Sequence, residues 1–148
     1  MFNICSIVAC GANAISKRYY VTDNKIERFA NLKNLQEYIS RIDEMNGLKV
    51  TTFDLRLKTP NVDTVMDTAS IHAFEHLGAT YFRNSEIKDK IVYFGPMGCR
   101  TGFYLLLRDK ISYKDAIALV VESMQFIQDF VGEIPGNKRE ECGNYLDH

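Results

Sequence analysis

The clearest indication of the fold is the stretch KIVYFGPMGCRTGFYLLL at residues 90–107. Residues 90–94 and 101–107 are rich in β-branched and aromatic side chains, which favours two strands. The connection between them, residues 95–100, contains two glycines and a proline and is typical of a tight turn. Strands joined so closely pair antiparallel, because a parallel pair needs a long crossover.

The residues before this hairpin predict a third strand and a helix. Residues 48–57 alternate apolar and polar side chains, which indicates a strand, and a change of phase suggests a bulge near Thr52. A helix is expected to begin at Asp67 or Thr68, either of which can cap it, and to continue to about Asn84. These two elements lie directly before the hairpin in the chain.

Two further segments have helical spacing. Apolar residues recur every three or four positions over residues 25–45, which predicts a helix, or two short ones, that closes at Asn46-Gly47. Ser112 begins a capping box before a second amphipathic helix, which Gly132 would stop. The tail from residue 134 onward is predicted to be a loop.

The order and number of these elements indicate the fold class. Residues 5–21 mix β-branched and small side chains and predict a strand and a loop. Helices and strands interspersed without a regular βαβ rhythm indicate an α+β fold, in which an antiparallel sheet packs against helices. A chain of 148 residues with 46% hydrophobic residues is long enough for one domain and too short for two ordinary ones, so 1–148 is expected to be a single domain.

Charge and hydropathy exclude several classes of partner. The 18 basic and 19 acidic residues leave no electrostatic footprint for nucleic acid or for a membrane surface. No apolar run approaches the ~20 residues of a membrane span. Four cysteines without a secretory signal favour reduced thiols and the cytoplasm. We therefore expect a soluble cytoplasmic protein whose partner is a small molecule or another protein.

The predicted helix carries the residues that form the chemical centre of the sequence, that is, its candidate metal-ligating and proton-transfer residues His72, Glu75 and His76. The two histidines lie one turn apart on one face, separated by about 40° of arc, so both imidazoles can reach one ion. Glu75 borders that face, where its carboxylate can move a proton beside the metal without ligating it. Two of the three histidines in the chain occupy this spacing. The competing interpretation is a pair of ordinary surface or core histidines.

The spacing of His72 and His76 does not determine which residue would be the third metal ligand. Zn²⁺ and Fe²⁺ bind imidazole readily, and a thiolate makes a fitting third ligand that leaves a position for water or substrate. Cys99 and Cys142 are both candidates, and one as ligand with the other as acid and base would use both thiols. Otherwise Cys99 is a structural turn residue and Cys142 has no role. The H-x-x-E-H spacing also occurs in inverted zinc peptidases, but a peptidase leaves both cysteines unexplained.

Four blocks of sequence, in the same order, resemble the S-ribosylhomocysteine lyases of the LuxS family. They are FDLR at 53–56 with PN at 60–61, HAFEHL at 72–77, GPMGCRTGFYL at 95–105, and IPG at 134–136 with ECG at 141–143. The blocks extend over roughly residues 50–146. The chemical centre found from the spacing of the histidines coincides with the family's site.

This resemblance implies a metal held by His72, His76 and Cys142, usually Fe²⁺ and often Zn²⁺ when the protein is isolated. The metal acts as a Lewis acid on the carbonyl of the open-chain ribose of S-ribosylhomocysteine, while Glu75 and Cys99 move protons. Enolisation moves the carbonyl along the sugar, and β-elimination then expels homocysteine. The other product is 4,5-dihydroxy-2,3-pentanedione, the precursor of the quorum-sensing signal autoinducer-2.

The resemblance also implies substrate contacts and an oligomeric state. Arg56 matches an arginine of the substrate pocket, and Arg83 is a second expected contact. Family members are expected to be homodimers whose N-terminal segments reach the substrate, whereas residues 1–47 diverge from the family pattern here. The chain also ends at His148, where the family continues into another helix. The alternative function is therefore a divergent relative that binds metal or ligand with lost or altered catalysis.

Overall fold

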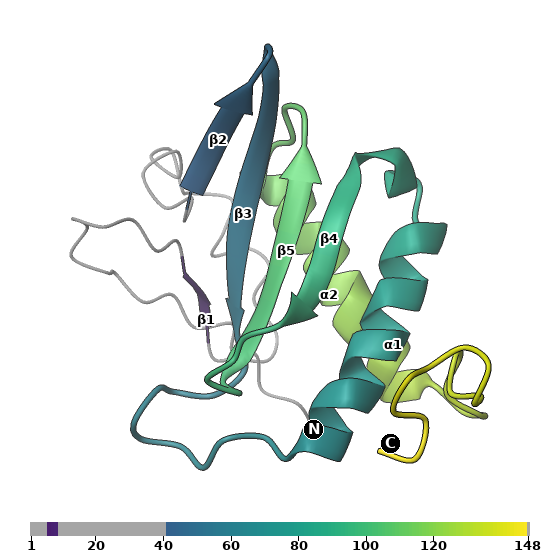
Figure 1. Cartoon of the computed structure of the whole chain (residues 1–148). Coiled ribbons are helices and arrows are strands. Elements are labelled where there is room, and N and C mark those ends of the chain that lie inside the picture. The colour runs from purple at the N-terminus through teal and green to yellow at the C-terminus, as the bar shows by residue number, and fades with distance from the viewer. Residues whose placement is uncertain (1–5, 9–40, 148) are drawn as a thin grey trace.

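The computed structural model of the protein describes residues 6–8 and 41–147. Within these residues, two helices cover one face of a five-stranded antiparallel sheet (Figure 1). The predicted α+β class is confirmed. The predicted hairpin is confirmed too, because its two strands are antiparallel neighbours in the sheet.

The elements follow the chain in the order β1 (Ser6–Val8), β2 (Arg41–Met45), β3 (Leu48–Arg56), α1 (Thr68–Asn84), the 3₁₀ helix η3 (Lys88–Lys90), β4 (Ile91–Pro96), β5 (Gly102–Arg108) and α2 (Tyr113–Asp129). The strand order is β1-β3-β5-β4, and β2 also pairs with β3. β2 pairs with the first half of β3 and β1 with its last residues, so the two share one edge of β3. Neither α1 nor α2 has the length and hydrophobicity needed to cross a membrane.

Both helices begin at the residues whose side chains were expected to cap them. The carboxylate of Asp67 accepts a hydrogen bond from the Ser70 N–H at 2.9 Å. The hydroxyl oxygen of Ser112 accepts one from the Asp115 N–H at 3.1 Å. These bonds satisfy N–H groups that have no partner inside the helix. α2 ends at Asp129, slightly earlier than the glycine expected to stop it.

The helix predicted over residues 25–45 is wrong where the structure describes it. Residues 41–45 form β2, which pairs with β3 through a turn at Asn46-Gly47. These two residues have φ angles of +52° and +80°, as a type I′ hairpin turn requires. An Asn-Gly pair is a strong hairpin signal, and the helical spacing before it was given too much weight. Residues 25–40 lie outside the described part of the chain.

The bulge predicted near Thr52 is also wrong, because β3 pairs with β5 without a register shift from Val50 to Arg56. β3 keeps a single alternation of its side chains. Its apparent change of phase arises because the apolar residues Leu48 and Val50 lie on the face away from the helices. The register shift of this sheet falls instead in β4, in its pairing with β5.

Aromatic rings join α1 to the sheet. Phe103 of β5 stacks on Phe94 of β4, with ring centroids 5.1 Å apart, and on Phe74 of α1 at 4.7 Å. Phe82, further along α1, contacts Phe94 at 4.8 Å. Gly78 lets the helix approach closely, because a Cβ there would lie 2.4 Å from the ring of Phe94. This packing fixes the position of the helix that carries the two histidines.

Gly102→Ala is expected to destabilise the sheet. A Cβ at Gly102 would lie 2.0 Å from the backbone carbonyl oxygen of Leu55 in β3, and strand backbone cannot yield without a change in pairing. We expect the free energy of unfolding to fall by about 2 kcal/mol, measured by urea denaturation. Gly98→Ala is the matched control, since nothing lies within 4 Å of its Cβ position. Equal stability of the two variants would contradict this packing.

Candidate functional site

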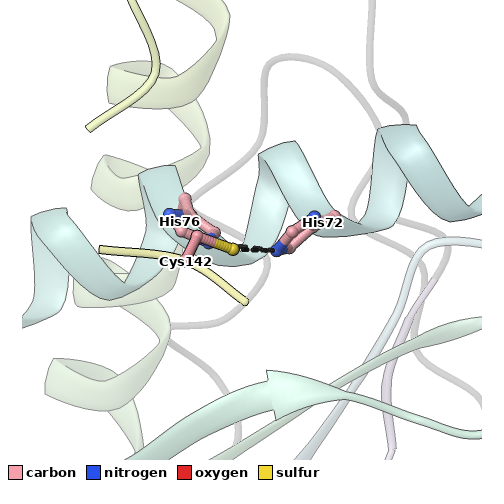
Figure 2. A group of neighbouring side chains, drawn as sticks. All are labelled: His72, His76 and Cys142. Carbon is pink, nitrogen blue, oxygen red and sulfur yellow. Dashed lines mark hydrogen bonds between the residues drawn. The ribbon is translucent and has the colours of Figure 1, made fainter. Parts of the chain in front are cut away.

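The three side chains expected to ligate a metal converge beside α1. His72 and His76 project from successive turns of the helix, and the C-terminal tail brings Cys142 against them (Figure 2). The two Nε2 atoms are 3.1 Å apart, and Sγ of Cys142 lies 3.3 Å from Nε2 of His72. All three ligand atoms lie within 4.8 Å of one another, which fits three ligands around one ion.

The hydrogen bonds of the imidazoles orient them for metal binding. Nδ1 of His72 lies 2.7 Å from the carbonyl oxygen of Asp147, and Nδ1 of His76 lies 2.8 Å from that of Pro135. A carbonyl oxygen only accepts, so each Nδ1 donates its N–H and each neutral ring carries its lone pair on Nε2. Two nitrogens at this distance need a proton or a metal ion between them, because their lone pairs would otherwise repel. The donor set therefore fits a divalent metal, with the carbonyls as outer partners.

Close contacts hold the tail against α1. Gly136 has a φ of +74°, and a Cβ there would lie 3.1 Å from Nδ1 of His76, so glycine lets the backbone pass over the ring. The N–H of Cys142 donates to the carbonyl oxygen of Lys138 at 2.9 Å. The Asn144 N–H donates to Sγ of Cys142 at 3.4 Å, which ties the cysteine to the following turn of the tail.

Glu75 and Arg83 occupy different parts of α1. Glu75 lies between the two histidines in the sequence and is half-buried. Arg83 is exposed in the last turn of the helix. At 1.5 Å of rise per residue, Arg83 lies about 10 Å along the helix axis from His76. Glu75 is therefore adjacent to the two histidines along α1, whereas Arg83 is two turns away.

Cys99 belongs to a second group of side chains, at the turn between β4 and β5. This turn is closed by a hydrogen bond of 2.9 Å from the Arg100 N–H to the Met97 carbonyl oxygen. Nη1 of Arg56, at the end of β3, donates to Sγ of Cys99 at 3.4 Å and to Oγ1 of Thr101 at 2.5 Å. Oγ1 of Thr101 lies 3.0 Å from the same sulfur. The structure thus brings together two of the predicted residues, Arg56 and Cys99.

Asp54 holds Arg56 in place. Nη2 of Arg56 donates to Oδ2 of Asp54 at 2.8 Å, and Nε lies 2.7 Å from Oδ1 in an ion pair without hydrogen-bond geometry. Asp54 is 1% exposed, and burial raises the pKa of its carboxyl although Arg56 acts to lower it. Burial also acts to lower the pKa of Arg56, but the bond and charge of Asp54 and a smaller contribution from Cys99 raise it above its usual value. The guanidinium therefore stays charged.

The surroundings of Cys99 lower the pKa of its thiol. The hydrogen bond with the Thr101 side chain is the largest cause, and partial burial opposes it. The Thr101 N–H and the guanidinium of Arg56 lower the pKa further. The sulfur is also exposed to solvent. An exposed thiol of lowered pKa gives up its proton more readily than an ordinary cysteine and can take it back, as a proton carrier must.

Four contributors to these groups were not predicted from the sequence, namely two side chains and two main-chain carbonyl oxygens. Asp54 and Thr101 lie inside quoted sequence blocks, and their position beside Arg56 and Cys99 was the available signal. The carbonyl oxygens of Pro135 and Asp147 had no signal, because every residue has a carbonyl.

The two groups lie at the same end of the sheet. α1 begins where β3 ends and where β4 turns into β5 (Figure 1). The Met66 N–H, just before α1, donates to the Arg100 carbonyl oxygen of that turn at 3.1 Å. A separate open hollow of about 960 Å³ lies between the C-terminal half of α1 and α2, lined by residues that include Tyr81, Lys110, Glu122 and Phe126. That hollow contains none of the predicted site residues.

The chain is similar to known proteins over most of its length. A family model described as S-ribosylhomocysteinase (LuxS) matches residues 28–148. The S-ribosylhomocysteine lyase of Clostridium acetobutylicum is 51% identical over 111 residues, which cover 74% of this chain and 70% of that protein. The enzyme of the same name from Finegoldia magna is 49% identical over 127 residues, which cover 84% and 81%. That of Phocaeicola vulgatus is 50% identical over 112 residues, which cover 75% and 70%. The resemblance of the four sequence blocks is thereby confirmed, and the chain belongs to the LuxS family.

Proposed function

We propose that this protein is a metal-dependent lyase that cleaves S-ribosylhomocysteine to homocysteine and 4,5-dihydroxy-2,3-pentanedione. The observation that carries the proposal is the convergence of His72, His76 and Cys142 in a chain of the LuxS family. Relatives about 50% identical to it bear the name S-ribosylhomocysteine lyase. The product named here would make the protein a source of the autoinducer-2 precursor.

We propose Fe²⁺ as the bound metal, with Zn²⁺ able to occupy the same ligands. Two imidazoles and one thiolate suit both ions and leave a position for a substrate oxygen. A divalent ion held by these residues would supply Lewis-acid polarisation of the carbonyl group of the open-chain sugar. The protein's part is to fix the ligands, as the carbonyl oxygens of Pro135 and Asp147 do for the two imidazoles.

Glu75 and Cys99 are proposed to move the protons. Migration of a carbonyl along a sugar requires a proton to leave one carbon and return to its neighbour. The elimination removes a further proton next to the carbonyl, and the carbon–sulfur bond breaks with its electron pair on sulfur, which then takes up a proton. Cys99 suits the reversible steps because its thiol pKa is lowered. Glu75 suits a step close to the ligand group, because it lies between the two histidines on α1.

The substrate contacts are proposed to be Arg56 and Arg83. Arg56 lies against Cys99, so its guanidinium can bond the sugar oxygens beside the proton carrier. Arg83, exposed two turns beyond His76, would meet the part of the substrate that lies away from the metal. We also propose that the protein acts in the cytoplasm, where its free thiols Cys99 and Cys142 stay reduced.

We further propose a homodimer formed through the sheet face away from the two helices. Met45, Leu48 and Tyr93 on this face are 74%, 51% and 49% exposed. Exposed apolar side chains gathered on one surface are typical of a contact between proteins. The face also carries Arg56, so a second copy would close over the Cys99 group.

Glu75→Gln and Cys99→Ala are each expected to lower homocysteine release by at least about 10²-fold, because each removes a proton-transfer group. Release is measured on Fe²⁺-loaded protein with a chromogenic thiol reagent. Metal content should not change, since neither residue is a ligand in the proposal. Glu86→Gln, an exposed carboxylate beyond α1, is the matched control and should keep full activity. Substrate binding without turnover by the unaltered protein would favour the divergent, inactive relative instead.

Removing the metal is expected to loosen the tail. The proposed ion joins α1 to Cys142, so chelation or Cys142→Ala should lower the melting temperature and increase tryptic cleavage after the exposed residues Lys138 and Arg139. Cys142→Ala should also bind less than one metal ion per chain by elemental analysis. Cys99→Ala is the control and should keep its metal. Full metal content in Cys142→Ala would overturn the ligand assignment.

Leu48→Glu is expected to dissociate the proposed dimer, because it places a charge in the apolar contact. Sedimentation velocity should show a monomer for this variant and a dimer for the unaltered protein. Val131→Glu changes a side chain that is 95% exposed beyond α2, and it should leave the dimer intact. Monomeric unaltered protein would contradict the proposed contact.

A further inference from the structure

Thr101 lies between Arg56 and Cys99, and the proposed proton transfers do not use it. Its Oγ1 is 2.5 Å from Nη1 of Arg56 and 3.0 Å from Sγ of Cys99. The side chain is 3% exposed, so water does not compete freely for these contacts. A hydroxyl in this position can link the guanidinium to the sulfur.

The chemistry of Arg56 decides the direction of the first of these hydrogen bonds. A guanidinium has only donors, so Oγ1 of Thr101 must accept from Arg56. The hydroxyl hydrogen of Thr101 stays available for the sulfur of Cys99, and it is the one hydrogen that can occupy this contact when the sulfur is a thiolate. A sulfur that accepts from both Thr101 and Arg56 is favoured as a thiolate, because both donors stabilise its negative charge.

The surrounding structure holds the hydroxyl in this orientation. Asp54 binds Nε and Nη2 of Arg56, which leaves Nη1 directed at Thr101. The carbonyl oxygen of Thr101 accepts hydrogen bonds from the N–H groups of Leu57 and Lys58, both at 3.0 Å. Threonine also has a restricted χ1 because its Cβ is branched. Main chain and side chain are therefore both set before any substrate arrives.

We propose that Thr101 is a positioning residue that donates its hydroxyl hydrogen bond to the sulfur of Cys99 and keeps that sulfur a thiolate ready to accept a proton. The inference rests on the proposed function only in taking Cys99 as a proton carrier. Of the charged groups in the described part of the chain, Arg56 acts on this sulfur, and Asp54 lies behind Arg56. The lowered pKa of Cys99, to which the Thr101 side chain contributes most, agrees with this role.

Thr101→Val tests the role, because valine keeps the shape of threonine and lacks the hydroxyl. The readout is the rate at which iodoacetamide alkylates Cys99 in the full metal-loaded chain between pH 5 and 10. Mass spectrometry of the Cys99 peptide separates it from the other cysteines. The rate follows the thiolate fraction, so we expect about a tenfold fall at pH values below the pKa and no change at the high-pH plateau.

The matched pair Thr101→Ser and Thr101→Ala separates the hydrogen bond from packing. Both variants lose the methyl group and only serine keeps the hydroxyl, so serine should retain the original pH profile while alanine shifts as valine does. This pair also serves if the valine variant does not fold. An unshifted valine or alanine profile, or an equal shift in serine, would overturn the inference. Turnover does not enter this readout, so a failure of the lyase activity would be seen separately.

Discussion

The stacking of Phe74 on Phe103 is the contact on which the candidate site depends. Phe74 lies on α1 between His72 and His76, and Phe103 is the second residue of β5, shortly after Cys99. One ring pair therefore sets the position of the ligand group relative to the turn that carries the thiol. Because the rings are buried and well packed, a rotation or shift of α1 would separate the two groups and open the core at the same time.

Sequence patterns predicted the parts of the fold that are encoded locally. Apolar spacing and capping residues gave α1 and α2, and a Gly/Pro-rich turn between two β-rich runs gave β4 and β5. The hairpin at Asn46-Gly47 was missed because apolar residues in a short strand can mimic helical spacing. In such short segments the spacing of apolar residues does not distinguish a helix from a strand. An Asn-Gly pair is the better signal, because both residues readily adopt the positive φ angles of a hairpin turn.

The sequence likewise predicted only the locally encoded part of the candidate site. The spacing of His72 and His76 indicates a ligand pair by itself, because one helix presents both. The residues alone left Cys99 and Cys142 as alternative third ligands, and only the family resemblance selected Cys142. It lies 66 positions after His76, and no local rule connects the two. The fold makes that connection through the tail, which places Sγ of Cys142 beside His72 and meets Nδ1 of each imidazole with a main-chain carbonyl oxygen. A sequence does not mark which carbonyl will face a side chain.

The ion pair of Asp54 and Arg56 is better explained by its effect on the orientation of the guanidinium than by a contribution to the stability of the fold. Taking a carboxylate and a guanidinium out of water costs several kcal/mol, and their attraction often does no more than offset that cost. The pair instead fixes the direction of Nη1, which then contacts both Thr101 and Cys99. His72 and His76 are held in the same way. A carbonyl oxygen contacts Nδ1 of each imidazole and so orients Nε2 toward the other ligand atoms. The chain thus holds both of the proposed reactive groups through residues that lie behind them, at the end of the sheet where α1 begins and β4 turns into β5.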